Sequence, residues 1–421
     1  MHINNIFIKR LHTLPSDADT RGHQIALKGG YIYQTGAGVY TFTPLGIKVL
    51  RNIENIIRTE MNKLDCQEIL MPVTSPASLW KESDRYNSVD VLLKFKNRAN
   101  NDFVLNPTHE EIVSDYARFC LESYKQLPFS LYQIQTKYRD ELRVRAGLIR
   151  CREFIMKDAY SFHRDWNDLN EFYNKMLLAY EKIYKLIGLD NIVSVLAPTG
   201  DMGGKISHEF QMISPVGEDT IYICSSCSYK SNKEMFADQN EEQKCPNCGK
   251  ILEKRRGVEI GNIFQLGYKY TKSMNVTYTD EDGTKKHPIM GCYGIGIGRS
   301  FACILEQAEL GKYVWNKLIA PYKVHIVTIG SSEEISNISG KIYKYLLAHN
   351  IETIIDDTED RPGSKFANAD LMGAPIRIIV SERNITTDNC LEIVEYNKNA
   401  EPVKTMVGVD GYENFVLGLF G

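Results

Sequence analysis

The sequence lacks a hydrophobic run long enough to cross a membrane, and it lacks a strong excess of either charge. No apolar stretch approaches the ~20 residues of a transmembrane helix, so we expect no membrane span. The formal net charge of −3 excludes a general nucleic-acid-binding surface, and any nucleic-acid partner must therefore meet local basic patches. The first twenty residues also lack the apolar core of a signal peptide and the character of a transit peptide, which predicts a cytoplasmic protein.

Paired cysteine spacing is also absent from most of the chain. Six of the ten cysteines show no paired spacing, which favours a reducing compartment. Internal repeats and low-complexity segments are missing as well. What remains is a chain of 421 residues with 43% hydrophobic and 24% charged residues, typical of a globular protein. Because single cores stop growing near ~250–300 residues, we expect at least two domains.

Two segments predict long amphipathic helices. Apolar residues recur at helical spacing from Pro44 to Leu64, with Thr43 as the N-cap, and again over residues 168–190 with Gly188 at the end. Short β-rich runs predict strands of a mainly antiparallel sheet, namely "EILMPV", "FSLYQIQTKY", "NIFQLGYKYT" and "KKHPIMGCYGIGIG". The first 319 residues are therefore expected to form an α+β domain.

The pattern changes after "IAPYK". Strands and helices alternate over residues 320–421, through "KVHIVTI", "SGKIYKYLLAHN", "IETIIDD", "KFANADLMG", "IRIIVSE" and "CLEIVEY". Such alternation predicts a separate small α/β domain.

Two Cys-x-x-Cys pairs stand within 25 residues, Cys224 with Cys227 and Cys245 with Cys248. Four thiolates in two knuckles suit tetrahedral zinc, and a site filled by four sulfurs usually holds structure rather than catalysing. An incidental cluster of thiols in a surface loop is the alternative. We expect residues 221–255 to be a zinc-bound insertion between two core strands, with the chemistry elsewhere.

Three separated segments carry groups suited to a nucleotide. Arg139 in "YRDE" offers a bidentate fork for phosphate, Glu141 can accept from an exocyclic amine, and Phe154 in "RCREF" can stack on a base. Arg299 follows three glycines in "GIGIGRS", where a backbone can approach a ligand closely. Each segment alone is equally compatible with an ordinary charged surface. Together they predict two arginines on one nucleotide.

Together these segments resemble the three motifs of class II aminoacyl-tRNA synthetases. The helix from Pro44 followed by "EILMP" is similar to motif 1, "YRDE…RCREF" to motif 2, and "GIGIGR" to motif 3. The runs "GVYTFTPLG", "NPTHEE", "REFIMKDAYSFH", "GGKISHEFQ" and "RPGSKFANADLMGAP" resemble prolyl-tRNA synthetases of the bacterial type. The resemblance extends from about residue 5 to the carboxyl terminus. It implies a catalytic domain over 1–319 with an antiparallel sheet and flanking helices, and an anticodon-binding α/β domain over 320–421.

The resemblance also implies roles for single residues. It places Thr108 and Glu110 at the proline imino group, and a carboxylate with a hydroxyl can accept both N–H groups of a cationic secondary amine. The remaining assignments are proline-pocket residues Met156, Asp158 and His208, ATP ligands Arg139, Glu141, Arg150, Phe154, Gln211 and Arg299, and tRNA contacts Arg143 and Arg145. Asp357 and Arg361 are neighbours of the anticodon surface, and Arg139 and Arg299 are the catalytic pair.

The implied reaction is attack of the proline carboxylate on the α-phosphate of ATP, followed by transfer of prolyl to the 3′ end of tRNA(Pro). Neither step needs a protein nucleophile, so alignment and neutralisation by arginine and Mg²⁺ should supply the rate. ATP is a substrate in this scheme, and zinc is structural. Motif 1 implies a homodimer.

The sequence departs from the family pattern in a few places. Many bacterial relatives carry a large editing domain between motifs 2 and 3, whereas here the interval holds little beyond the two knuckles. Discrimination against a smaller amino acid is limited to ~10–200-fold per methylene, so we expect alanine to be activated and not cleared by this chain. Pro198 and Lys205 border the expected proline site and stand where relatives differ. Val144 departs in the motif 2 loop.

Two other classes of function are also considered. A catalytically silent paralogue would bind tRNA or an amino acid for regulation, and loss of Arg139, Glu110 or Arg299 would have favoured it. A zinc-ribbon nucleic-acid binder would need basic residues around the knuckles, where "ADQNEEQ" is acidic instead. A synthetase for a related amino acid is a further alternative.

Overall fold

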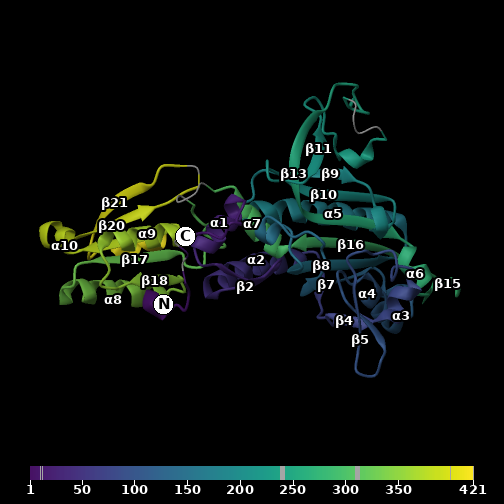
Figure 1. Cartoon of the computed structure of the whole chain (residues 1–421), viewed down its shortest axis with the longest axis horizontal. Coiled ribbons are helices and arrows are strands. Elements are labelled where there is room, and N and C mark those ends of the chain that lie inside the picture. Colours follow the sequence, from purple (N-terminus) through teal and green to yellow (C-terminus); the bar gives the residue numbers. More distant parts are fainter. Residues whose placement is uncertain (10, 12, 238–241, 309–312, 399, 421) are drawn as a thin grey trace. The chain divides into compact units, whose positions relative to one another are not determined.

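A computed structural model describes residues 1–9, 11, 13–237, 242–308, 313–398 and 400–420 of the chain (Figure 1). Residues 238–241, which belong to the acidic stretch between the knuckles, lie outside these described residues. Two compact units emerge from the contacts. One contains residues 1–35, 41–53 and 304–421, and the other contains residues 36–40 and 54–303. The expected boundary at residue 319/320 stays a prediction.

A nine-stranded sheet forms the core of the second unit, and its pairings are antiparallel except at β3–β7 and β12–β9. In spatial order its strands are β10 (Ile206–Ile213), β9 (Ile192–Ala197), β12 (Lys230–Asn232), β11 (Asp219–Ile223), β13 (Glu253–Gly267), β16 (Ile289–Gly296), β8 (Glu153–His163), β7 (Phe129–Tyr138) and β3 (Gln67–Glu68). The predicted antiparallel sheet is confirmed. β13 also pairs with β10, so that five of the strands close on themselves.

Smaller sheets and seven helices occupy the rest of the described chain up to residue 306, some of them in the first unit. β4 (Thr74–Pro76), β6 (Asp102–Leu105) and β5 (Leu93–Lys96) form a three-stranded sheet, β14 (Tyr278–Thr279) pairs with β15 (Lys285–Lys286), and β1 (Ile32–Gly36) pairs with β2 (Val39–Phe42). The helices up to residue 306 are α1 (Arg21–Lys28), α2 (Pro44–Asn62), α3 (Ala77–Glu82), α4 (Glu110–Cys120), α5 (Trp166–Leu186), α6 (Lys269–Ser273) and α7 (Ile297–Glu306).

Both predicted long helices are present. α2 begins at Pro44, and the Thr43 hydroxyl accepts from the Gly46 amide at 3.3 Å. In α5 the Asp165 side chain caps the amino terminus by accepting from the amides of Asn167 and Asp168. The apolar residues at the centre of each helix are fully buried, namely Leu50, Ile53 and Ile57 in α2 and Met176, Tyr180 and Ile183 in α5. Periodicity therefore identified both helices, and the predicted N-cap Thr43 marked the start of α2, whereas the cap Asp165 of α5 was not predicted.

Three strand predictions were partly wrong. The run "KKHPIMGCYGIGIG" is divided between β15 and β16, and helix α7 begins at Ile297. In the region around "EILMPV", only Gln67–Glu68 pairs as a strand. Beyond it, side chains of β7 take the place of backbone pairing: Gln133 accepts from the Met71 amide at 2.9 Å, and Gln135 donates to the Met71 carbonyl at 2.8 Å. "NIFQLGYKYT" changes from strand to helix α6 after Gly267, whose φ of 67° ends β13.

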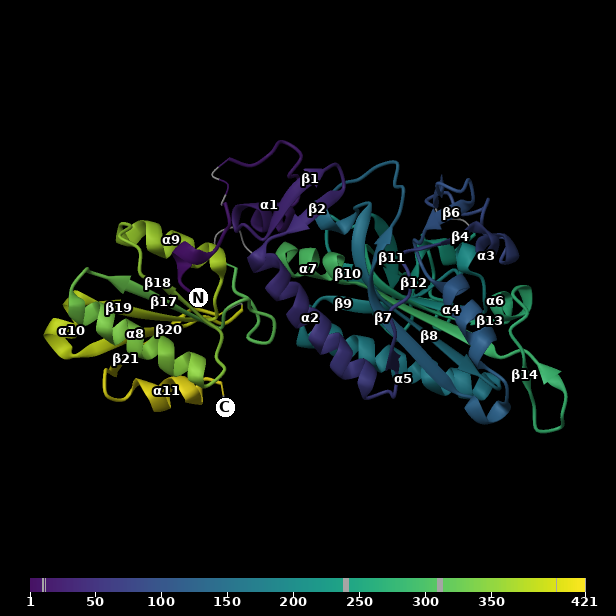
Figure 2. The same ribbon diagram turned by 90° about the horizontal axis from the view of Figure 1, so that it is seen from below.

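The carboxyl-terminal part is α/β, as predicted. Its five-stranded sheet has the order β18 (Thr353–Asp356), β17 (Val324–Ile329), β19 (Ile376–Ser381), β20 (Cys390–Glu395) and β21 (Val403–Gly408). Figure 2 shows this sheet with its helices α8 (Glu333–Ala348), α9 (Pro362–Met372), α10 (Glu382–Asp388) and α11 (Tyr412–Gly418). Among the described residues, no helix has both the length and the apolar character required to span a bilayer.

Candidate active site

The register of the nine-stranded sheet separates two faces. Asp158, Gly294, Asn262 and Glu209 are cross-strand partners from β8 to β10, and residues directly opposite each other point to the same face. We call this the polar face. The adjacent row, Ala159, Tyr293, Ile263 and His208, points to the other face, along which helix α5 lies (Figure 1). We call that the packing face.

Thr108 and Glu110 meet at the start of α4. The Thr108 hydroxyl donates to Glu110 Oε2 at 2.6 Å, and the Cys292 thiol lies 3.0 Å from Glu110 Oε1. Glu110 is fully buried and is the first residue of its helix, where a carboxylate is stabilised by the helix dipole. The two residues predicted to bind the imino group are thus brought together.

Asp158 occupies the centre of a polar network next to this pair. Its Oδ2 accepts from Gln133 at 2.9 Å and from the Tyr160 hydroxyl at 2.8 Å, while Lys137 Nζ lies 2.8 Å from Oδ1. Tyr160 in turn accepts from the amide of His109 at 2.9 Å, one residue before Glu110. The network therefore joins Asp158 on β8 to the start of α4.

His109 is kept neutral inside the same network. Burial, together with the nearby charge of Lys137, lowers the pKa of His109 to about 4. Its Nε2 lies 2.9 Å from the Pro72 carbonyl, which makes this nitrogen the donor in the neutral ring. The histidine therefore holds α4 to the segment before β4 without adding charge to the site.

Arg139 and Arg299 converge although 160 positions separate them in sequence. Burial lowers the pKa of Arg139, and the like charge of Arg299 lowers it further. The guanidinium of Arg139 lies over the Phe154 ring at 5.2 Å, whereas Arg299 donates to the Ile149 carbonyl at 2.8 Å and lies 3.6 Å from the Glu259 carboxylate. Two arginines so placed favour an anion between them.

The motif 2 loop carries a chain of ion pairs. Arg150 donates from Nε and Nη2 to Glu141 Oε2 at 3.1 and 2.9 Å, and from Nη1 to Glu218 at 3.0 Å. Arg145 also pairs with Glu218. Arg143 is exposed. The predicted adenine reader and its neighbouring arginine are thus paired, and Arg143 is open to a larger partner.

The remaining residues expected at the site divide between the two faces. Phe154 and Met156 share the polar face with Asp158. Gly294 has no side chain there, and a Cβ at that position would lie 3.7 Å from the Met156 sulfur. Gln211 donates to Glu209 at 2.9 Å and to Asp219 at 2.8 Å.

His208 is the exception among the predicted site residues. Its Nδ1 lies 2.8 Å from the Tyr173 hydroxyl of α5, and burial lowers its pKa. The structure therefore places His208 on the packing face and does not bring it together with Thr108, Glu110 and Asp158.

Several charged residues of the polar face were missed by sequence reasoning. Arg85 is buried and contacts both Glu110 and Glu111, Lys137 pairs with Asp158, and Glu209 has its pKa raised to about 7 by burial and by the nearby Glu259 and Asp219. The adjacent acids of "HEE" were a signal for Arg85, because two buried carboxylates require a cation.

The four predicted zinc ligands form one cluster, whose ligand atoms all lie within 4.8 Å of one another. The sulfurs of Cys224 and Cys248 are 3.5 Å apart, as are those of Cys227 and Cys245. Tetrahedral zinc with Zn–S bonds of ~2.3 Å separates its sulfurs by about 3.8 Å, so the cluster fits a metal ion. Residues 214–252 connect β10 to β13 and contain this cluster.

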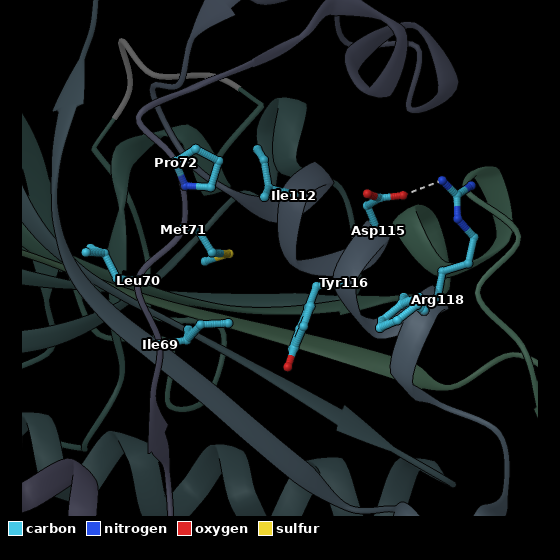
Figure 3. A pocket seen from close by; sticks show the side chains of 9 residues that line it. Ile69, Leu70, Met71, Pro72, Ile112, Asp115, Tyr116 and Arg118 are labelled. Carbon is cyan, nitrogen blue, oxygen red and sulfur yellow. Dashed lines mark hydrogen bonds and ion pairs between the residues drawn. The ribbon is translucent and has the colours of Figure 1, made fainter.

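An apolar hollow of about 710 Å³ opens beside α4 and the segment before β4 (Figure 3). Its lining includes Leu70, Tyr116 and Phe119, whose exposed fractions are 74, 44 and 84%. Figure 3 shows the Asp115–Arg118 ion pair at one side of the hollow. Large apolar side chains this exposed usually mark a binding surface.

The chain matches two family models. Residues 93–308 match the tRNA synthetase class II core domain (G, H, P, S and T), and residues 323–415 match the anticodon binding domain. The first covers the polar face, including the segments of Glu110, Arg139 and Arg299. The second covers the five-stranded sheet of the carboxyl-terminal part.

Curated relatives and solved structures agree with these matches. A proline–tRNA ligase from Ehrlichia ruminantium (strain Gardel) is 41% identical over 400 residues, covering 91% of this chain and 93% of the relative. One from Halothermothrix orenii (strain H 168 / OCM 544 / DSM 9562) is 32% identical over 535 residues, covering 91% and 94%. In fold, the chain is similar to a prolyl-tRNA synthetase from Cryptosporidium parvum with a TM-score of 0.76 at 19% identity, covering 94% of this chain and 76% of that one.

Proposed function

Because the chain belongs to the proline–tRNA ligase family of class II aminoacyl-tRNA synthetases, we propose that its polar face binds proline and ATP and joins them as prolyl-adenylate. The observation that carries this proposal is the convergence of separate segments on one sheet face. Thr108 with Glu110, Asp158 with Lys137, and Arg139 with Arg299 all meet there. A site with acids at one end and arginines at the other suits a cationic amine and a polyphosphate.

Thr108 and Glu110 bind the imino group in this proposal. Glu110 Oε2 already accepts from Thr108, and its second lone-pair direction is free to accept from a substrate N–H. Met156 forms part of the wall against the proline ring, and the Asp158 network fixes the floor. Lys205, which is exposed, and Pro198 border this site and are positions where ligand preference can differ.

Arg139 and Arg299 bind the phosphates, and Phe154 stacks on adenine. Glu141 accepts from the exocyclic amine and is held in place by Arg150, while Gln211 lies beside Glu209 on the same face. The proline carboxylate attacks the α-phosphorus, and the bond to the bridging oxygen of pyrophosphate breaks. The two arginines stabilise negative charge on the phosphoryl oxygens as it redistributes, so no protein nucleophile is required.

Mg²⁺ fits the acidic part of the polar face. The pKa of Glu209 is raised to about 7 by burial and by repulsion from Glu259 and Asp219, and a divalent cation would relieve that repulsion. When bound, Mg²⁺ supplies further neutralisation of phosphate oxygens. Glu209 and Glu259 are the residues that would hold it.

The third substrate is tRNA(Pro): a hydroxyl of its 3′ terminal ribose attacks the carbonyl carbon of prolyl-adenylate, and the bond to the phosphate oxygen breaks to release AMP. Arg143 and Arg145 in the motif 2 loop are suited to the acceptor stem, because both are exposed and cationic. The carboxyl-terminal sheet would bind the anticodon, with Asp357 and Arg361 near that surface. We place the enzyme in the cytoplasm, where these substrates are available.

Editing of alanyl-tRNA by this chain is not part of the proposal. Only 39 residues, 214–252, separate β10 from β13, and they form β11, β12 and the cysteine cluster. The alignment with the Halothermothrix relative spans 535 positions, but only 91% of this chain, about 383 residues, takes part in it. About 150 positions of that relative therefore have no counterpart in this chain. Rapid deacylation of preformed Ala-tRNA by the purified chain would contradict this proposal.

Zinc at the four cysteines would be structural, because all four coordination positions are taken by protein sulfur. The cluster packs with Tyr222 and Leu252 in a small core of its own. A metal there would stabilise that core without touching substrate.

A homodimer is the proposed assembly, and the apolar hollow at α4 supports it. Ile69 to Pro72, which belong to the motif 1 resemblance, line the hollow together with Tyr116 and Phe119. A second copy of the chain would cover these exposed side chains. Substituting Leu70→Asp with Phe119→Asp should shift the mass measured by light scattering from dimer to monomer, and a parent chain that is monomeric at micromolar concentration would contradict the assembly.

The test of the activity is amino-acid-dependent ATP–pyrophosphate exchange with proline, alanine and cysteine. The proposal predicts strong exchange with proline and weaker exchange with alanine. Exchange that depends on none of the three would favour the silent paralogue instead.

A further inference from the structure

Arg85 lies directly behind the acid pair that begins α4. It follows helix α3, is 5% exposed, and donates from Nη1 to Glu111 Oε1 and Oε2 at 3.0 and 3.3 Å. The same Nη1 lies 3.6 Å from Glu110 Oε2, the oxygen that accepts from Thr108. The guanidinium is held over the Trp80 ring at 5.1 Å and near the Tyr270 ring at 5.5 Å. Its position is therefore fixed from several sides.

The two carboxylates use this arginine differently. Glu111 takes its hydrogen bonds and also accepts from Ser83 at 2.7 Å, whereas Glu110 lies beyond hydrogen-bond distance and receives only its charge. Glu110 therefore has a positive charge 3.6 Å from Oε2 and keeps its capacity to accept a hydrogen bond from a ligand. Burial alone would lower the pKa of Arg85, but Glu111 and Glu110 help to raise it, so the arginine stays charged.

The other cations near Glu110 have partners elsewhere. Lys137 is paired with Asp158 at 2.8 Å. Lys269 and Arg139 also interact with the charge of Glu110, but Lys269 donates to the Asp201 carbonyl and Arg139 lies over the Phe154 ring. Arg85 lies 3.6 Å from Glu110 Oε2, which is within ion-pair distance.

Arg85 also contacts a loop on the other side of the site. Its Nη2 donates to the Met202 sulfur at 3.4 Å. Met202 ends a 3-10 turn over Gly200–Met202, and the following loop is held to β13 because the Lys205 amide donates to the Gln265 carbonyl at 2.9 Å. Arg85 thus links the acid pair to this loop.

We propose that Arg85 is a positioning residue for amino-acid recognition, which holds Glu110 as an accepting anion for the substrate imino group while Glu111 absorbs its hydrogen bonds. This inference rests on the proposed function, in which Glu110 binds that group. It assigns Arg85 an effect on amine recognition and none on ATP.

The experiment measures KM for proline and for ATP by pyrophosphate exchange in full-length variants. Removing Arg85 alone would leave buried charge and endanger folding, so the principal variant is Arg85→Met with Glu111→Gln, which removes one charge of each sign. Arg85→Lys keeps the charge without the fork. Arg164→Met is the matched control, because Arg164 pairs with Asp280 and Glu281 at the surface, away from the site.

The double variant should raise KM for proline by about 10–100-fold, the loss expected for an impaired charged contact, and leave KM for ATP within about threefold. Tetrahydrofuran-2-carboxylate, which has a ring oxygen in place of the cationic nitrogen, should inhibit the parent and the double variant with constants within about threefold of each other. Arg85→Lys should fall between parent and double variant, and Arg164→Met should match the parent.

Two results would overturn the inference. One is a folded double variant whose KM for proline stays within threefold of the parent. The other is a parallel loss for proline, ATP and the oxygen analogue, which would indicate a structural role. Glu110→Gln separates this inference from the proposed function: if that variant also binds proline normally, the amine site itself is misassigned, whereas a defect in Glu110→Gln alone rejects only the role of Arg85.

Discussion

The two faces of the nine-stranded sheet bury their side chains for different purposes. On the packing face, aromatic rings of α5 pack against aromatic rings of the sheet. The ring centroids of Tyr180 and Phe210 are 5.0 Å apart, and those of Tyr173 and Tyr293 are 6.3 Å apart. On the polar face, Asp158, Lys137 and Glu110 are equally buried but contact one another through charges and hydrogen bonds.

The difference shows which face is organised for a ligand. Burying charges costs free energy that a hydrophobic face of similar volume would not lose. The like charges of Arg139 and Arg299, and those of Glu209 and Glu259, remain close together and raise that cost further. Stability alone does not explain this arrangement, whereas binding of a polyphosphate and a cationic amine does.

The strongest way to test this difference is to remove a charge from the polar face. Arg139→Ala should lower the rate of proline-dependent pyrophosphate exchange by about 10²–10³-fold, because one preorganised contact to the phosphates is lost. The midpoint of thermal unfolding should fall little, since relief of repulsion from Arg299 offsets the lost packing on Phe154. Exchange near the parent rate would remove Arg139 from the site.

The packing face also contains a buried lysine, Lys157, which donates to the Tyr180 hydroxyl at 2.6 Å. Burial lowers its pKa from 10.5 to about 7. Between pH 7 and 10.5 the unfolded chain binds more protons at this residue than the folded chain, so its contribution to stability rises with pH and is lost as pH falls toward 7.

Chemical denaturation at pH 7 and pH 9 checks this prediction. The free energy of unfolding of the parent, relative to Lys157→Met, should increase by about 2 kcal/mol from pH 7 to pH 9. An equal pH dependence in both chains would show that Lys157 is not neutral in the folded state. Pyrophosphate exchange by Lys157→Met should stay near the parent rate, because the residue is on the packing face.

The cysteine cluster tests whether stability can be changed without touching the polar face. Cys245→Ser should lower the midpoint of thermal unfolding by about 2–4 °C, the shift that ~1 kcal/mol produces in a domain of this size, and should increase proteolysis within residues 214–252. Proline activation should be retained. A selective loss of activation with unchanged stability would connect the cluster to catalysis.

Local patterns in the sequence predicted most of the fold. Helical periodicity identified α2 and α5, with the N-cap Thr43 marking the start of α2 and Gly188 lying just beyond the end of α5, and the run "FSLYQIQTKY" coincides with β7. The failure at "EILMPV" has a long-range cause, because side chains of Gln133 and Gln135 take the place of strand pairing there. Sequence composition does not reveal such a substitution.

The candidate site was predicted where a motif specified the residue type, and missed where only folding brings residues together. Thr108 with Glu110 and Arg139 with Arg299 converge as expected. Arg85 lies in a segment that contains no recognised motif. The adjacent acids Glu110 and Glu111 could suggest that a cation lies nearby, but not which residue supplies it. The face on which His208 lies depends on the register of β10, because a shift by one residue would move its side chain to the other face of the sheet.

The most direct test of the account compares one residue from each face, Glu110→Gln and His208→Gln, by the KM for proline in pyrophosphate exchange. The account predicts an increase of about 10–100-fold for Glu110→Gln and less than about threefold for His208→Gln, since only Glu110 lies where the imino group would bind. A large increase for His208→Gln, with Glu110→Gln near the parent value, would contradict it.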